Sequence, residues 1–166
     1  GIMFPDREQY DCKRIDKSYV EQRALWEPLY DVTQIKGDGE THPFLSPNYE
    51  FADYETWDFG NLDLSAGKED EMLAAEYARE ALKRGLEFTQ KMGANPFKFG
   101  MIGSTDSHTS LATADENNFF GKHSGNEINN KDRVLAPQNL GTRKGRFGWH
   151  YLSSGYAAVW ATSNTR

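Results

Sequence analysis

The sequence predicts an α/β fold, and three features of the chain carry this prediction. An amphipathic segment from Glu69 to Met92 lies between two segments with strand character, Tyr30–Ile35 and Phe97–Ile102. A strand, a helix and a strand in this order are typical of a parallel β/α unit. Much of the remaining chain is rich in turn and aromatic residues, which indicates long irregular loops. The length of 166 residues fits one domain.

The N-terminal part is expected to contain a short helix and the first strand. The helix runs from Ile15 to about Glu27, and Pro28 ends it because proline has no amide hydrogen to donate. The strand Tyr30–Ile35 contains three β-branched residues, which favour extended structure. The irregular stretch Lys36–Gly67 follows, and its many aromatic residues argue against disorder. Within it, Pro47–Tyr54 is a candidate for a short helix.

The helix Glu69–Met92 is the clearest element of the sequence. Its first turn is acidic, its apolar residues recur at helical spacing, and Gly93 with the nearby Asn95 and Pro96 ends it. Phe97–Ile102 then reads as a buried strand. Leu111–Tyr151 is expected to be mostly irregular, and Gly155–Thr162 is expected to form a last short apolar strand.

Composition excludes several classes of partner. The net charge of −6 and the pI of about 5.2 argue against broad binding to nucleic acid or anionic membranes. No apolar run approaches the roughly 20 residues that span a bilayer, so we expect no membrane span. The single cysteine, Cys12, cannot form an internal disulfide and does not decide the compartment.

Two short motifs, each an acid, one spacer and a histidine, are the best candidates for a functional site. Glu40 with His42 follows the first predicted strand, and Asp106 with His108 follows the strand Phe97–Ile102. In extended backbone, residues two apart point to the same side, so each pair can aim a carboxylate and an imidazole at one point. These donors suit Zn, Mn or Fe(II).

Each motif also has a structural interpretation. Asp106 can cap the segment that follows it, with His108 as an ordinary loop histidine. Glu40 and His42 can lie in a surface turn with their charges in water. Ser104 is disfavoured as a nucleophile because the Gly-x-Ser-x-Gly pattern is absent.

Four stretches of the chain resemble a bacterial family known as the domain of unknown function numbered 3604. They are Leu25–Pro43, Phe99–Thr109, Leu111–His123 and Gly155–Arg166, so the resemblance spans essentially the whole chain. That family resembles the polymerase-and-histidinol-phosphatase (PHP) superfamily of metal-dependent hydrolases. The resemblance implies a distorted β/α barrel of seven strands that binds two or three Zn, Mn or Fe ions. It also favours a periplasmic or secreted bacterial protein over a cytoplasmic one.

The resemblance also implies roles for particular residues. Asp106 and His108 match the late Asp-x-His motif that donates both side chains to the metal cluster. Glu40 is the best match to a glutamate near the end of a middle strand, and His42 competes for that role. An early His-x-His pair and a His-Asn string are absent here. Residues 1–166 are therefore expected to be a partial PHP-like domain, completed by the remainder of the same polypeptide or by another segment.

The expected function is that of a metal-dependent hydrolase, a phosphoesterase acting on a small-molecule substrate with metal-activated water. Asp106 and His108 are the expected catalytic ligands, and the aromatic, acidic stretch Phe44–Asp63 is expected to form part of the pocket wall. An acidic wall suits an anionic phosphate only if metal ions neutralise it. The alternative is a non-catalytic module whose aromatic-rich loop recognises a sugar or a peptide.

Overall fold

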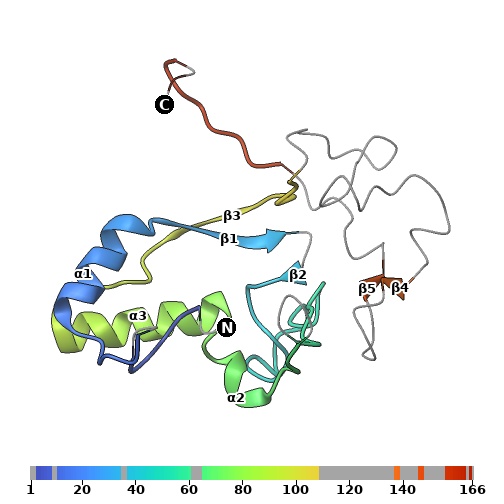
Figure 1. Ribbon diagram of the computed structural model, residues 1–166, viewed down its shortest axis with the longest axis horizontal. Coiled ribbons are helices and arrows are strands. Elements are labelled where there is room, and N and C mark those ends of the chain that lie inside the picture. The colour runs from blue at the N-terminus through green and yellow to red at the C-terminus, as the bar shows by residue number, and fades with distance from the viewer. Residues whose placement is uncertain are drawn as a thin grey trace.

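The fold is mixed α/β, with helices on one side of a small open sheet (Figure 1). The computed structural model describes residues 3–8, 11–34, 37–60, 65–108, 137–138, 146–147, 156–163 and 165. The described helices and strands, in chain order, are α1 Lys17–Trp26, β1 Leu29–Gln34, β2 Gly37–Asp38, α2 Asp70–Leu73, α3 Ala78–Met92, β3 Gly100–Gly103, β4 Pro137–Gln138 and β5 Arg146–Phe147.

The central pairing joins β1 to β3 in parallel, which confirms the predicted β/α unit. Leu29 lies opposite Gly100 and Asp31 lies opposite Ile102 before the register shifts by one residue. β2 pairs antiparallel with the end of β1, so the strand order is β2-β1-β3. These three strands thus form an open sheet, and no closed barrel is present among the described strands. β4 and β5 form a separate antiparallel pair.

α1 begins and ends close to its predicted limits. Asp16 is the N-cap, and its side chain accepts a hydrogen bond of 2.8 Å from the backbone amide of Tyr19. Such a bond satisfies one of the amides that the first helical turn leaves without a partner. Within α1, Val20 is the buried residue, and it directs the helix onto the core.

The predicted helix Glu69–Met92 is divided into α2 and α3. The interruption has a tertiary cause, because the backbone amides of Ala78 and Arg79 donate to the carbonyls of Gly39 and Glu40, at 2.9 and 3.0 Å. The first turn of α3 is therefore bound to the loop after β2 instead of continuing the helix before it. At its C-terminal end α3 stops at Gly93, whose φ of 78° few other residues adopt easily.

The core lies between α1, α3, the start of β1 and the N-terminal segment. Its buried members are Phe4, Ile15, Val20, Ala81, Phe88 and Phe97. Phe4 packs edge-to-face on both Tyr30 and Phe97, with ring centroids 5.2 and 5.5 Å apart. The N-terminal segment thus acts as part of the core and joins the sheet to the helices.

Four further expectations differ from the structure or lie outside its described residues. Residues 47–54 form successive turns instead of a short helix. β3 starts later than predicted and is mostly exposed instead of buried, because the core lies around Phe97 and Phe88, before the strand begins. Most of Leu111–Tyr151 lies outside the described residues, and residues 156–163 belong to no helix or strand. No described helix is long and apolar enough to cross a bilayer.

We predict that Phe97→Ala lowers the free energy of unfolding by about 3–5 kcal/mol, because it leaves a cavity in the core. The Phe97 side chain is 1 % exposed and contacts the rings of Phe4 and Phe88. Urea denaturation followed by circular dichroism measures the change. Phe51→Ala is the matched control, because Phe51 is 57 % exposed. Equal losses in the two variants would contradict this placement of the core.

Candidate functional site

The carboxyl ends of β1 and β3 lie at the same edge of the sheet. The backbone amide of Ser104 donates to the carbonyl of Thr33 at 2.9 Å, so the chain leaving β3 stays beside the end of β1. Ligand sites of parallel sheets lie at this edge. The structure therefore places Asp106 and His108 where the sequence predicted, in a loop that directly follows β3.

The loop 104–108 has a specific local conformation. Asp106 has a φ of 49°, in the left-handed region that aspartate tolerates better than most residues. The backbone amide of Ser107 donates to Oγ1 of Thr105 at 3.2 Å. Nδ1 of His108 lies 2.8 Å from the carbonyl oxygen of Asp106. The carbonyl can only accept, so Nδ1 carries the hydrogen and the lone pair of the neutral imidazole lies on Nε2.

Sequence reasoning missed Asp31, which is joined to the same loop. Asp31 lies within β1, opposite Ile102 of β3, and is partly buried. The hydroxyl of Ser104 lies 3.5 Å from Oδ2 of Asp31. This places a second carboxylate, besides that of Asp106, next to the start of the loop that carries Asp106 and His108. The sequence feature that could have identified Asp31 is its charge in the middle of a strand whose other residues are mostly apolar or β-branched.

Glu40 is held by α3. Both Nε and Nη2 of Arg79 donate to Oε1 of Glu40, at 3.0 and 2.6 Å. This hydrogen bonding raises the pKa of the Arg79 guanidinium, which also lies over the ring of Tyr49 at 4.0 Å. A carboxylate bound in this way fastens the loop to the helix. Its contacts favour an anchoring role for Glu40 over direct metal ligation.

His42 has both ring nitrogens engaged in hydrogen bonds. The backbone amide of Phe44 donates to Nδ1 at 3.1 Å, so the hydrogen of the neutral ring lies on Nε2. Nε2 then donates to Oδ2 of Asp58 at 2.9 Å. The ring also packs on Tyr77, with centroids 5.6 Å apart. The lone pair that a metal ion requires is thus already used by the amide of Phe44.

The two acid-x-His pairs do not form one metal site within the described residues. No three side chains among the described His, Cys, Asp and Glu come together in a group that could hold a metal ion. Asp106 and His108 supply two suitable donors, and Glu40 and His42 are committed to other partners. A complete hydrolytic metal site, which takes three or more protein ligands, would need donors from beyond this part of the chain.

Asp38 ends β2, two residues before Glu40. Its Oδ1 accepts from the hydroxyl of Thr33 at 3.0 Å, and its Oδ2 accepts from the amide of Glu40 at 3.2 Å. Burial raises the pKa of the Asp38 carboxyl above its ordinary value, although these hydrogen bonds oppose the change. The hydrogen bonds thus fix the position of the Asp38 carboxylate, whereas burial of the site disfavours its negative charge.

Comparison with known proteins gives one match. The family model described as "Protein of unknown function (DUF3604)" matches residues 1–166. No curated protein and no solved structure matches the chain.

We predict that Asp38→Asn reduces the pH dependence of stability. The native state holds the Asp38 proton more tightly than the unfolded chain does, so the free energy of unfolding falls as pH rises from the ordinary pKa of 3.8 through the raised native value. The effect is small because the carboxyl is about half buried. Urea unfolding at pH values from about 4 to 7 measures it. Asp53→Asn, which removes an exposed carboxylate, should leave the slope unchanged, and an equal effect there would contradict the prediction.

Proposed function

We propose that this chain, which belongs to the DUF3604 family of proteins of unknown function, is part of a metal-dependent hydrolase. The single observation that carries the proposal is the imidazole of His108. Its Nδ1 donates to the carbonyl of Asp106, which directs the lone pair to Nε2. Metal-binding histidines typically donate their other nitrogen to a carbonyl or carboxylate in this way.

The proposed site has Asp106 and His108 as ligands of a divalent transition metal, Zn, Mn or Fe, and the complete protein holds more than one ion. Other ligands come from residues outside the described part of the chain, in the same polypeptide or in another segment. A bound ion of this kind lowers the pKa of a water molecule and polarises the scissile bond. Asp31 and Ser104 position the loop through their contact beside the end of β3.

The proposed substrate is a small phosphoester, and the proposed fold of the complete domain is a PHP-like barrel of seven strands. The parallel β1–α3–β3 arrangement supports the barrel, because it is the repeating unit of such folds. The phosphoester rests on the resemblance to the superfamily, so it is an argument by analogy. The acidic loop is compatible with it if the metal ions offset the negative charge.

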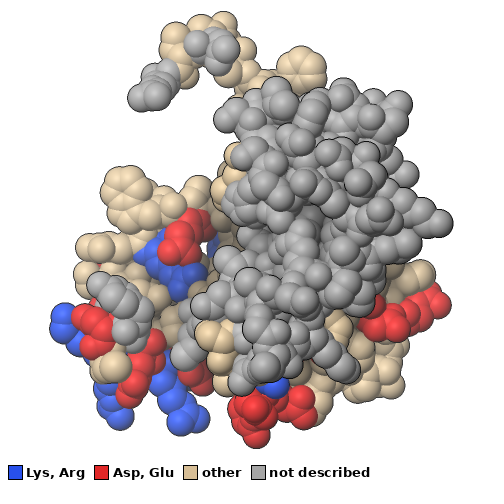
Figure 2. All heavy atoms as spheres, turned by 45° about the vertical axis from the view of Figure 1, so that its right-hand side comes forward, with Lys and Arg blue, Asp and Glu red and all other residues tan. Residues whose placement is uncertain are grey.

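The second candidate function is a binding module for a sugar or a peptide. Four aromatic side chains between residues 44 and 59 are exposed, namely Phe44, Phe51, Tyr54 and Phe59. No Lys or Arg occurs from residue 37 to residue 67. Figure 2 shows acidic atoms among uncharged ones at the lower right, whereas Lys and Arg gather mainly at the lower left. Exposed aromatic groups of this kind are typical of recognition surfaces.

Metal content distinguishes the two functions. We predict at least one transition-metal ion per chain in the protein as purified, measured by inductively coupled plasma mass spectrometry, and loss of that ion in Asp106→Ala and His108→Ala. His42→Ala is the control that should keep its metal, because both nitrogens of His42 serve Phe44 and Asp58. A folded protein without metal would exclude the hydrolase proposal and favour the binding module.

We also predict that Asp106→Ala and His108→Ala each reduce kcat/KM for p-nitrophenyl phosphate by about 1,000-fold. Removing a metal ligand costs several kcal/mol of transition-state stabilisation, and each 1.4 kcal/mol is about tenfold in rate. The measurement is release of p-nitrophenol with metal supplied in excess. Asp6→Ala removes an exposed carboxylate away from the site and should retain activity. Full activity in both site variants would refute the assignment.

A further inference from the structure

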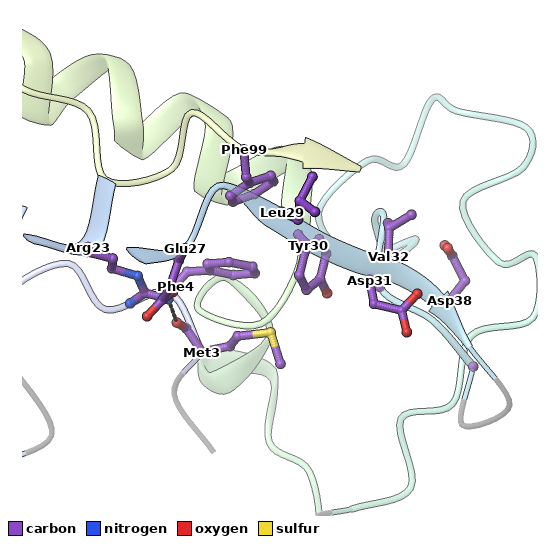
Figure 3. Close-up of a pocket in the computed structure, with 12 residues that line it drawn as sticks. Met3, Phe4, Arg23, Glu27, Leu29, Tyr30, Asp31, Val32, Asp38 and Phe99 are labelled. Atoms are coloured by element: carbon purple, nitrogen blue, oxygen red, sulfur yellow. Dashed lines mark hydrogen bonds and ion pairs between the residues drawn. The ribbon is translucent and has the colours of Figure 1, made fainter. Parts of the chain in front are cut away.

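A cavity of about 400 Å³ lies along the edge of β1 (Figure 3). β2 pairs only with Thr33 and Gln34, so no described strand covers this edge over the first four residues of β1. The N-terminal residues Met3 and Phe4 and the segment Gly37–Gly39 form other parts of its wall. The volume lies within the range of sites for small molecules. Neither Asp106 nor His108 lines it, so it is distinct from the proposed metal site.

One part of the cavity is aromatic. Phe4, Tyr30 and Phe99 form a mutually packed set, with ring centroids 5.2 to 5.7 Å apart. Figure 3 shows these three rings together in the middle of the labelled residues, beside Leu29. Such a wall offers apolar contact and the negative faces of aromatic rings, which attract cations.

The opposite part of the cavity is acidic. In Figure 3, Asp31 and Asp38 lie at the end away from Arg23 and Glu27. Arg23 and Glu27 form an ion pair of 2.7 Å and so offset each other. Asp31 and Asp38 both line the cavity, and a hydrogen bond from the Thr33 hydroxyl holds Asp38 beside the end of β1. The charged side chains that line the cavity sum to −2 at neutral pH, one cation against three carboxylates.

The environment of the Tyr30 phenol includes the same negative field. Burial raises the pKa of its phenol to about 12, and the carboxylates of Asp38, Asp31 and Glu76 add to the shift. Burial opposes a charge of either sign, but the contribution of the carboxylates opposes a phenolate and favours a positive charge in the same place. The cavity is therefore unsuited to an anion and suited to a cation.

We propose that this cavity binds a small organic ammonium ion with a short apolar chain. The ammonium group lies between Asp31 and Asp38, where it gains charge-assisted hydrogen bonds or direct ion pairing. The apolar chain lies against Phe4, Tyr30 and Phe99. A bare divalent metal ion is a poorer occupant, because no three metal-binding side chains of the described residues converge here.

Isothermal titration calorimetry with n-butylammonium tests the proposal. Two probes of similar size, neutral n-butanol and anionic butyrate, measure the contribution of the charge. We expect saturable binding of n-butylammonium at least about tenfold tighter than binding of n-butanol, no binding of butyrate, and weaker binding as salt rises. Equal affinity for n-butylammonium and n-butanol, or no saturable binding of n-butylammonium, would overturn the proposal.

Substitutions of the cavity residues test whether n-butylammonium binds in this cavity. Asp38→Asn keeps a carbonyl oxygen that can accept from Thr33 or Glu40 and removes the charge, so n-butylammonium affinity should fall at least about tenfold. Asp31→Asn gives an independent measurement if Asp38→Asn does not fold, as judged by circular dichroism. Asp53→Asn removes one exposed charge outside the cavity and is the matched control. An equal loss in Asp53→Asn would show that general electrostatic attraction, and not this cavity, is responsible.

Discussion

The attachment of residues 39 and 40 to the first turn of α3 is the constraint on which much of this structure depends. Two backbone hydrogen bonds, from Ala78 to Gly39 and from Arg79 to Glu40, are reinforced by the side-chain pair of Arg79 with Glu40. Together they stop α3 from continuing toward α2, and they fix the path of the chain that leaves β2. The amides of a helical first turn have no partners inside the helix, so a nearby loop can satisfy them.

The structure distinguishes two motifs that look alike in sequence. Each is an acid, one spacer and a histidine, and each follows a strand. In the first, Arg79 binds the acid, and the amide of Phe44 takes the lone pair of His42. In the second, the carbonyl of Asp106 takes the hydrogen of His108 and leaves the lone pair on Nε2. The difference lies in whether the backbone partner of each imidazole donates or accepts.

Several of the acidic residues that give the chain its net negative charge lie around Tyr30 and one cavity. Asp31, Asp38 and Glu76 contribute to the field at Tyr30, and Asp31 and Asp38 face one cavity. This distribution disfavours a free phosphate as a ligand of the cavity, because a negative wall repels an anion and attracts a cation. A metal cluster and an ammonium site are two physical means of offsetting the same negative charge. Asp31 takes part in both proposals, through its contact with Ser104 and through the cavity, but the proposed ligands Asp106 and His108 do not line that cavity, so each proposal can be tested separately.

The sequence by itself determined the local elements: Pro28 marked the end of α1, Gly93 marked the end of α3, and the spacing of apolar residues marked α3 as amphipathic. It also indicated the parallel unit and the loop with Asp106 and His108, because these follow from patterns along a few residues. Only the tertiary structure decided that α2 and α3 are separate and that Glu40 and His42 have structural partners. It also revealed Asp31 beside Ser104, 73 positions away. Those outcomes depend on hydrogen bonds between segments far apart in the chain, which periodicity and spacing do not encode.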